Sequence, residues 1–437
     1  MTPWVILMFL SLMALLMLGY PVAFTLGAVA LAFGSIFLGL DFFHLLPLRI
    51  WGVMTNFTLL AVPLFIFMGI VLDKSGLAED LLETTGLLFG KVRGGLALSV
   101  VIVGALLAAT TGVVGATVVT MGIIALPTML KRGYSPPLAT GTIAAAGTLG
   151  QIIPPSIVLI LLGDVMGVPV GRLFLGAVMP GLTMVILFLL YIFSIAWLKP
   201  GNAPALETVE DGNLLVKVLF TLLPPLLLVV GVLGSIFFGV ASPTESAAIG
   251  ALGAMLLAAI HRRLTLKNLK QAMRLTTRLT SMVFLILIGA TAFGLVFRGM
   301  GGDRLVMEAL INMPGGRGMF LLVSMSLIFA LGFFLDFFQI CFIVIPILTP
   351  IANTLGIDLL WLAVLVGINL QTSFLTPPFG FSLFYLKAVS PSEVRIQHIY
   401  RGIIPFVVLQ IITIIVLIVF PQIVSWLPDL MDKVQGL

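Results

Sequence analysis

The chain has 437 residues, of which 60% are hydrophobic and only 9% are charged. Soluble domains carry about 25% charged residues, so this composition excludes a soluble enzyme or binding domain and indicates an integral membrane protein. The net charge of +5 does not indicate a nucleic-acid partner, because basic loops on one side of a membrane account for it.

Apolar stretches of about 20 residues, long enough to cross a bilayer as helices, follow one another along nearly the whole chain. We expect ten full crossings, at 3–19, 22–40, 56–73, 138–163, 173–198, 215–241, 245–261, 279–298, 359–387 and 402–420. Two further apolar stretches, 96–130 and 319–350, are too short for two crossings each, and we expect re-entrant hairpins of two half-helices there. Amphipathic segments at 77–89 and 303–312 predict arm helices along the interface.

The two halves of the chain repeat each other at an offset of 223 residues. The matching pairs are Gly27 and Gly250, Gly76 and Gly299, Asp80 and Asp303, Gly95 and Gly318, Pro127 and Pro350, Gly133 and Gly356, Pro154-Pro155 and Pro377-Pro378, and Arg172 and Arg395. We therefore divide the chain into repeat 1 (1–213) and repeat 2 (214–437). Five crossings per repeat place the second copy upside down relative to the first, which is the inverted topology of many transporters.

The basic residues predict the orientation. One face of the expected topology receives 16 Lys and Arg residues and the other receives six, which accounts for all 22. The basic-rich face is expected to be cytoplasmic, so both termini lie outside, hairpin 96–130 opens inward and hairpin 319–350 opens outward. The loop 261–278 carries the strongest signal, with an anionic-lipid or partner site as the alternative.

Each Pro-Pro pair interrupts an expected crossing. A proline inside a helix leaves a backbone carbonyl without its donor, so we expect the carbonyls of Gly150, Gln151, Ser373 and Phe374 to be free and to converge. Such neutral oxygens suit a monovalent cation such as sodium. The polar residues flanking the breaks are functional candidates, although any one of them can instead bond back to its own helix: Thr148, Gln151, Ser156, Asn369, Gln371, Thr372, Ser373 and Thr376.

The expected hairpin tips lie near Thr110-Thr111-Gly112 and near Gly332 to Asp336. A helix that begins at such a tip directs its free N–H groups at the centre of the membrane, where an anionic substrate would fit. Asp336 is expected to cap the following helix or to help hold a cation. Arg49, on the outer face, is a candidate carboxylate ligand, with an interfacial anchor as the alternative.

Two features are read as structural. Cys341 lies in an apolar run and is expected to be a small buried side chain. Ser242-Pro243-Thr244-Glu245 has the spacing of a helix capping box. The three histidines are scattered and no phosphate-binding loop occurs, so no enzyme is indicated and energy for transport must come from an ion gradient or another subunit.

Four sequence stretches give a family resemblance: GTLGQIIPPSIVLILLGD (147–164), SPTESAAIGA (242–251), LDFFQICFIVIPILTPIANTLGID (335–358) and LTPPFGFSLF (375–384). The chain resembles the large membrane subunit of tripartite ATP-independent periplasmic (TRAP) transporters, the DctM-like family. The resemblance implies sodium-driven import of an organic acid across the bacterial inner membrane by an elevator movement, in which the hairpins and broken helices slide against a scaffold. It also implies two separate partners, a small four-helix membrane subunit (DctQ-like) and a periplasmic substrate-binding protein (DctP-like).

The resemblance further implies two sodium sites between the hairpin tips and the breaks. Site 1 would use Thr111, Gly150, Ile153 and Pro155, and site 2 would use Gly332, Ser373 and Thr376. The substrate-binding candidates are Thr110, Gln151, Ser156, Asp336, Gln371, Thr372 and Arg49. The first tip, Thr111-Gly112-Val113-Val114, has fewer hydroxyls than is usual in the family, which implies more ligation by backbone carbonyls there.

Two other functions remain open on the sequence. A stand-alone sodium/dicarboxylate symporter of similar architecture would transport without the two partners. A membrane scaffold subunit would use the broken helices for packing alone.

Overall fold

The structure is a computed structural model, and it describes residues 2–111, 114–205, 214–311 and 313–435. Its regular secondary structure is helical throughout these ranges. The first half contains α1 (Thr2–Met17), α2 (Val22–Phe37), η1 (Leu40–Leu45), α3 (Leu46–Met54), η2 (Thr58–Leu60), α4 (Ala61–Lys74), α5 (Leu77–Leu88), α6 (Gly95–Thr111), α7 (Val114–Lys131), α8 (Pro136–Thr148), η3 (Leu149–Gln151), α9 (Ile157–Met166), α10 (Val170–Leu198) and η4 (Pro200–Asn202). The second half contains α11 (Leu214–Phe237), α12 (Pro243–Ile260), α13 (Leu266–Gly299), α14 (Gly302–Ile311), α15 (Gly316–Leu331), α16 (Phe337–Gln339), η5 (Ile340–Val344), α17 (Ile345–Thr354), α18 (Leu359–Leu375), α19 (Phe381–Val389), α20 (Ile396–Val419) and α21 (Gln422–Gln435).

The helices of the two halves correspond at the repeat offset. Helix α7, at 114–131, matches the continuous helical run α16–η5–α17 at 337–354, and α9, α10 and α5 match α19, α20 and α14. The contacts between helices are also repeated. Helix α2 packs on α13, and their repeat counterparts α12 and α4 pack on each other in the same way. Likewise α8 packs on α20 and α18 packs on α10. Such reciprocal contacts are the pattern that a pseudo-two-fold axis produces.

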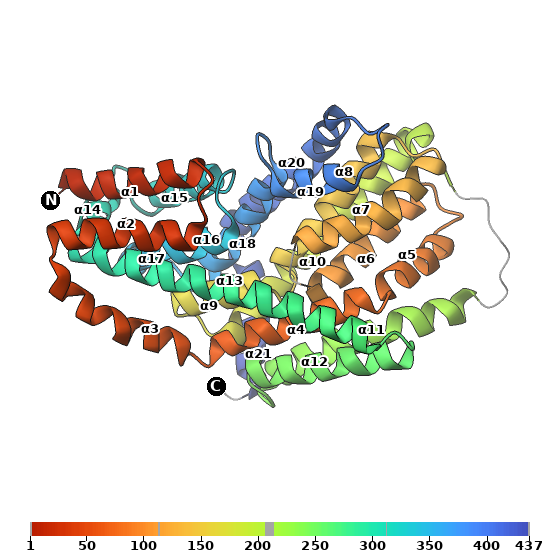
Figure 1. The fold of residues 1–437 in the computed structure, drawn as a ribbon. Helices are drawn as coiled ribbons and strands as arrows, with labels where there is room; N and C mark the ends of the chain where they lie inside the picture. The colour runs from red at the N-terminus through yellow and green to blue at the C-terminus, as the bar shows by residue number, and fades with distance from the viewer. Residues whose placement is uncertain (1, 112–113, 206–213, 312, 436–437) are drawn as a thin grey trace.

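The helices, labelled in Figure 1, pack in two groups that also touch each other, where α4 meets α6 and α13 meets η5. The hairpin α6–α7 packs on the broken helix α8–α9, and the hairpin α15–α17 packs on α18 and α9. The pairs α2–α13 and α4–α12 form a second group beside them. The hairpins and broken helices are therefore packed together.

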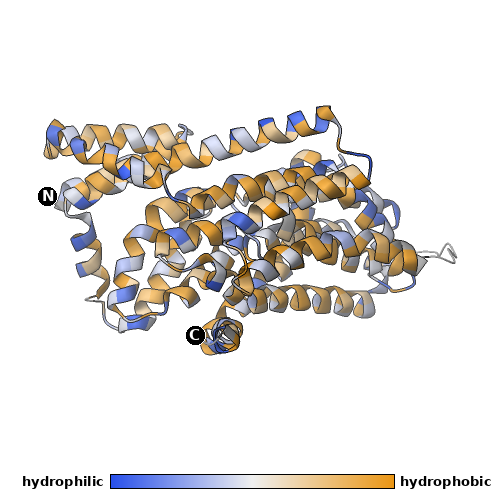
Figure 2. Cartoon of the chain, turned by 90° about the horizontal axis from the view of Figure 1, so that it is seen from below, coloured by the Kyte–Doolittle hydropathy of each residue, from blue (hydrophilic) through white to orange (hydrophobic). Residues whose placement is uncertain are grey.

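Within the described residues, seven helices are long and apolar enough to cross a membrane on their own, and the bent pair 40–54 and 58–74, with an angle of 56°, makes an eighth candidate. Hydrophobic residues predominate along these helices (Figure 2). Five of the ten expected crossings are single helices of this kind, whereas α1, α2 and the pieces of the broken helices are shorter. The broken helices fall short because the prolines divide each crossing.

The second limb of each hairpin is longer than the half-helix expected there. Residues 114–131 and 337–354 each form 18 helical residues, which makes them candidates for spanning on their own. At 1.5 Å per residue, each limb is about 27 Å long. Only two residues separate α6 from α7, which leaves more of the stretch for the limbs than we assumed.

Three further expectations about boundaries are corrected. The expected loop 261–278 is a loop only as far as Thr265, whose hydroxyl caps α13, and the basic stretch is the first half of that 34-residue helix. The crossing 56–73 is the second part of the bent pair. Helix α21 was not expected at all.

The arm helices α5 and α14 lie where they were predicted, although residue 312 falls outside the described residues.

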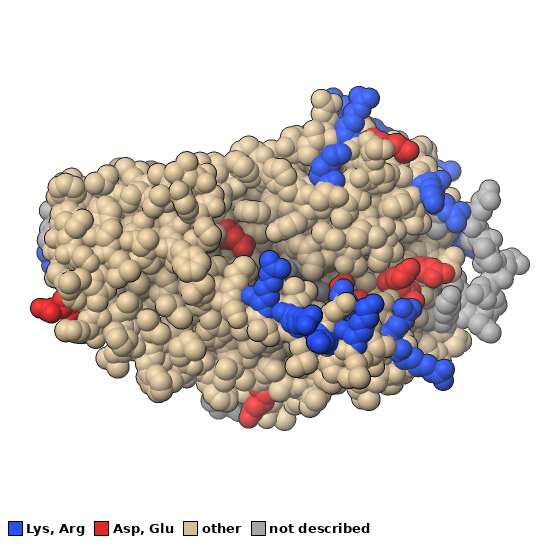
Figure 3. All heavy atoms as spheres, viewed as in Figure 1, with Lys and Arg blue, Asp and Glu red and all other residues tan. Residues whose placement is uncertain are grey.

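Basic side chains gather over part of the molecule. Figure 3 shows Lys and Arg running from the middle of the visible face to the end that carries α5 and α7, whereas the end with α1 and α14 shows few charges. The predicted orientation remains a prediction. Cys341 is fully buried and the capping box at Ser242 is formed in both directions, so both structural readings are confirmed.

Candidate functional site

The first break lies between α8 and α9. Helix α8 tightens into the short turn η3, and the bond between Pro154 and Pro155 is cis. Gly150 lies where hairpin 1 packs, because a Cβ atom added to it would lie 3.2 Å from the carbonyl oxygen of Ala108 in α6. This glycine therefore lets the first break approach the backbone of the first hairpin close to its tip.

The second break repeats this arrangement. Helix α18 ends at Leu375, the bond between Pro377 and Pro378 is again cis, and α19 begins at Phe381. Gly332, at the end of the first limb of hairpin 2, lies against Ser373, whose Cβ would be 2.7 Å from an added glycine Cβ. The predicted partners of sodium site 2 therefore lie together.

The expectation of four free carbonyls is corrected. Ser156 donates its hydroxyl hydrogen to the Gln151 carbonyl at 2.9 Å, and Ser382 does the same for the Phe374 carbonyl at 3.0 Å. The Thr376 amide donates to the Ser373 carbonyl at 3.1 Å. Within the described residues, the Gly150 carbonyl accepts no hydrogen bond from outside its own helical turn. Serines placed after each break thus satisfy carbonyls that the prolines release.

The hydroxyls of the second break donate to their own helix. Thr372, Ser373 and Thr376 bond to the carbonyls of Ile368, Leu370 and Thr372 at 2.7–2.8 Å. Their hydrogens are thereby used, and each oxygen keeps lone pairs for another partner. Hydrogen bonds back to the same helix were the alternative to a functional role for these residues. They leave the hydroxyl oxygens as acceptors that a cation can use.

Two buried glutamines differ in their partners. Gln371 donates to the Thr148 hydroxyl at 3.2 Å, and its amide oxygen has no partner among the described residues. Gln151 is fully buried, and neither atom of its amide has a partner in that part of the chain. Buried amides are normally hydrogen-bonded, so these two side chains are candidates for binding a ligand.

The hairpin tips are described in part. Helix α6 includes Thr110 and Thr111, but their side chains, and all of Gly112 and Val113, lie outside the described residues. Asp336 accepts a hydrogen bond from the Phe337 amide at 2.6 Å and caps the helix that follows, as predicted. Ile153 is partly buried and Pro155 is fully buried in the connection after η3.

The oxygen donors around the breaks suit a monovalent cation. The described residues contain no group of three or more His, Cys, Asp or Glu side chains, so carbonyl and hydroxyl oxygens are the ligands offered. Neutral oxygens favour a hard ion of single charge over a divalent or soft one. The residues present therefore fit sodium at the second break, and at the first they offer the Gly150 carbonyl.

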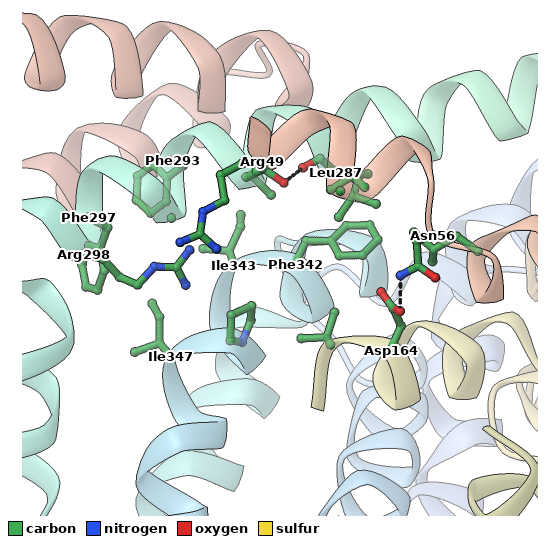
Figure 4. Close-up of a pocket in the computed structure, with 18 of the residues that line it drawn as sticks. Arg49, Asn56, Asp164, Leu287, Phe293, Phe297, Arg298, Phe342, Ile343 and Ile347 are labelled. Atoms are coloured by element: carbon green, nitrogen blue, oxygen red, sulfur yellow. Dashed lines mark hydrogen bonds between the residues drawn. The ribbon is translucent and has the colours of Figure 1, made fainter. Parts of the chain in front are cut away.

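Arg49 lies in a different cavity. This space of about 490 Å³ is lined by α3, α9, α13, α14 and the second limb of hairpin 2 (Figure 4). Its polar residues are Arg49, Arg298, Asn56, Asp164, Asp303 and Thr291. Sequence reasoning did not select Arg298, Asn56 or Asp164 as site residues, although Asp164 is the single charged residue of the apolar helix α9, which was a usable signal.

Two hairpins held against two proline-broken helices define the class of protein: a secondary membrane transporter with internal repeats. Comparisons with known proteins identify the transporter family. The family profile "Tripartite ATP-independent periplasmic transporter, DctM component" matches residues 9–423. The chain therefore belongs to the DctM family and is a TRAP transporter large permease subunit.

Curated relatives agree with this assignment. The C4-dicarboxylate TRAP transporter large permease protein DctM of Pseudomonas aeruginosa is 30% identical over 88% of this chain and 89% of its own length. The sialic acid TRAP transporter large permease protein SiaM of Vibrio cholerae is 29% identical over 96% and 97%. The ectoine TRAP transporter large permease protein TeaC of Halomonas elongata is 28% identical over 97% and 99%.

The fold also has a solved counterpart. The YdaH transporter of Alcanivorax borkumensis superposes with a TM-score of 0.64, covering 96% of this chain and 98% of that one, at 14% sequence identity. The likeness is one of architecture.

Proposed function

We propose that this subunit imports an organic acid together with sodium, by an elevator movement of the hairpins and broken helices against the scaffold. A periplasmic binding protein delivers the acid, and a small membrane subunit accompanies the chain in the inner membrane, with both termini periplasmic. The named relatives handle C4-dicarboxylates, sialic acid and ectoine, which all carry a carboxylate. A carboxylate is therefore the substrate group that we assign to this chain.

The observation that carries the proposal is the contact between Gly332 and Ser373. It brings the tip of hairpin 2 against the second break, where the hydroxyl oxygens of Ser373 and Thr376 retain lone pairs. A sodium ion bound there would stabilise the closed contact between tip and break, and it would also supply positive charge for a carboxylate nearby. Gly150 and Ala108 form the corresponding contact at the first break.

The elevator movement is supported by how the elements pack. Both hairpins contact the broken helices, and those contacts join elements from the two repeats, such as α7 with α19 and α9 with α17. Elements tied in this way move as one unit. The pairs α2–α13 and α4–α12 supply the scaffold against which that unit slides, along the contacts of α4 with α6 and of α13 with η5.

The test is uptake into proteoliposomes containing the chain, its small membrane subunit and the binding protein. Radiolabelled succinate, N-acetylneuraminate and ectoine are supplied with an inward sodium gradient or with choline in place of sodium. We expect sodium-dependent uptake of at least one compound, and its loss in Gly150→Leu and Ser373→Leu. Uptake that survives both substitutions contradicts the site assignment, and uptake by this chain alone contradicts the tripartite assembly.

A further inference from the structure

Arg49 and Arg298 reach the same cavity from different elements. Arg49 extends from α3 and Arg298 from the last turn of α13, and Figure 4 shows both guanidinium groups directed into the space between them. The ion pairs of the described residues join Arg172 to Asp429 and Asp432, so neither of these arginines takes part in one. Two guanidinium groups held together without ion-pair partners favour an anion between them.

Within the described residues, the acidic groups of the cavity form no ion pair with either arginine. The Asp164 carboxylate accepts a hydrogen bond from Asn56 and, in Figure 4, lies at the opposite end of the cavity from the arginines. Asp303 lines the cavity and feels the charge of Arg298, but it forms no ion pair with it. The cavity thus has one end with two arginines and Asp303 nearby, and another end with Asp164 and Asn56.

The walls between these ends are apolar. They include Phe342, Ile343 and Ile347 from the second limb of hairpin 2 and Phe293 from α13. A space of about 490 Å³ falls in the size range of cavities that bind small molecules. A carboxylate at the arginines and a hydroxyl or amine at Asp164 would match both ends of such a space.

The arginine pair is not a by-product of the repeat. At the repeat offset, Arg49 corresponds to Ala272 and Arg298 to Ser75, so the second copy of this position carries neither charge. The pair is present only on the face that we predict to be periplasmic. An importer needs an anion site on that face and not on the other.

We infer that this cavity is an outer binding site for a small carboxylate-bearing solute, held by Arg49 and Arg298 before it reaches the sodium-dependent site at the breaks. The inference deepens the proposed function and rests on it for the direction of transport. Since α3 and α13 face α9 and hairpin 2 across the cavity, movement of the hairpins and broken helices against the scaffold would dismantle the site and release the solute.

The test uses the full-length chain in nanodiscs, free of sodium. Its arginines are modified with phenylglyoxal and quantified by mass spectrometry, with and without millimolar succinate, N-acetylneuraminate or ectoine. We expect at least one of these probes to protect Arg49 and Arg298, while Arg317, an exposed arginine at the start of α15, stays reactive. Protection should require no sodium, because no ligand of the break region is involved.

Variants sharpen the result. Arg49→Gln should raise the probe concentration that half-protects Arg298 by about tenfold, as loss of one charged hydrogen bond predicts. Arg298→Gln should do the same for Arg49, and Arg317→Gln should change neither value. The same variants are assayed for sodium-dependent uptake, where the two cavity variants should need more substrate for half-maximal rate.

The two proposals can fail separately. Absence of protection, or equal protection of Arg317, in a chain that still shows sodium-dependent uptake overturns the outer site and leaves the proposed function standing. If the arginine pair is protected but uptake does not depend on sodium, the outer carboxylate site is supported and sodium-coupled import is overturned. A chain with neither property contradicts both.

Discussion

Gln371 and Thr148 occupy equivalent positions in the two halves of the chain, 223 residues apart, and the Gln371 amide donates a hydrogen bond to the Thr148 hydroxyl at 3.2 Å. A residue that touches its own repeat counterpart lies on the axis that relates the two copies. The pseudo-two-fold axis therefore passes between α8 and α18, one turn before each helix breaks. Both candidate sodium sites are arranged around this point.

Replacing the buried glutamines near the axis should separate function from stability. Gln151→Met removes an amide with no partner among the described residues, and Gln371→Met removes an amide whose oxygen has none but whose nitrogen donates to the Thr148 hydroxyl. An unpaired buried polar group costs about 1–3 kcal/mol, so we expect the melting temperature of Gln151→Met to stay level or rise. Gln371→Met also loses the hydrogen bond to Thr148, so its melting temperature should stay level or fall slightly. Sodium-dependent uptake should fall at least about tenfold, as loss of a ligand group predicts.

The matched control for these glutamines is Gln410→Met in α20. Gln410 is equally buried, and its amide is also without a partner among the described residues, but it belongs to neither break. It should keep uptake intact. Equal loss of uptake in all three variants would show that the effect is general packing.

Gly332→Ala should disrupt the second sodium site. The added Cβ would meet the Ser373 Cβ at 2.7 Å, a distance that forces the hairpin tip away from the break. Overpacking of this kind costs about 1–3 kcal/mol, and we expect a higher sodium concentration for half-maximal uptake. Gly318→Ala, earlier in the same helix and with no atom within 4 Å of its Cβ, is the control and should leave that concentration unchanged.

Tethering Asn56 to Asp164 should stop transport reversibly. These side chains hydrogen-bond the bend before α4 to the end of the broken helix α9, and an elevator movement must separate them. Asn56→Cys with Asp164→Cys, in a Cys341→Ala background, should lose uptake when a short thiol cross-linker is added and regain it with a reductant. Each single cysteine should be insensitive to the cross-linker. Full uptake by the cross-linked protein would exclude movement between these two elements.

Helix α21 should depend on apolar packing more than on its ion pairs. Arg172 pairs with Asp432 at 3.0 Å, but these side chains are 49% and 31% exposed, and such pairs contribute about 0–1 kcal/mol. Val424 is fully buried and packs against Gly176 in α10. Val424→Ala should therefore accelerate hydrogen exchange in α21, by about 1–2 kcal/mol of local opening free energy, and Arg172→Ala should do so much less. The reverse order would show that charge holds the helix.

The sequence predicted the features that depend on backbone chemistry. Proline pairs in apolar stretches located both breaks, the capping sequence at Ser242 predicted the start of α12, and Asp336 was expected as a helix cap. These predictions succeeded because a missing N–H group or a capping carboxylate acts within a few residues of chain.

Features that depend on distant segments were predicted less well. The carbonyl of Phe374 was expected to be free, but Ser382 reaches it from beyond the break. Arg298 was counted as a basic residue of the outer face, yet its position opposite Arg49 follows from how α13 packs on α3. Helix α21 was missed because its short amphipathic sequence carries no strong apolar run, and its buried face is defined by α10.

The most direct test of the account is the thermal stability of the purified chain in sodium chloride compared with choline chloride at equal ionic strength. A ligand at ten times its dissociation constant stabilises the folded state by about 1.4 kcal/mol. We predict a higher melting temperature in sodium for the natural sequence and for Gly318→Ala, with the increase reduced or lost in Gly332→Ala and in Ser373→Leu. Equal melting temperatures in the two salts for the natural sequence, or an undiminished sodium effect in both site variants, would contradict a sodium site between the hairpin tip and the break.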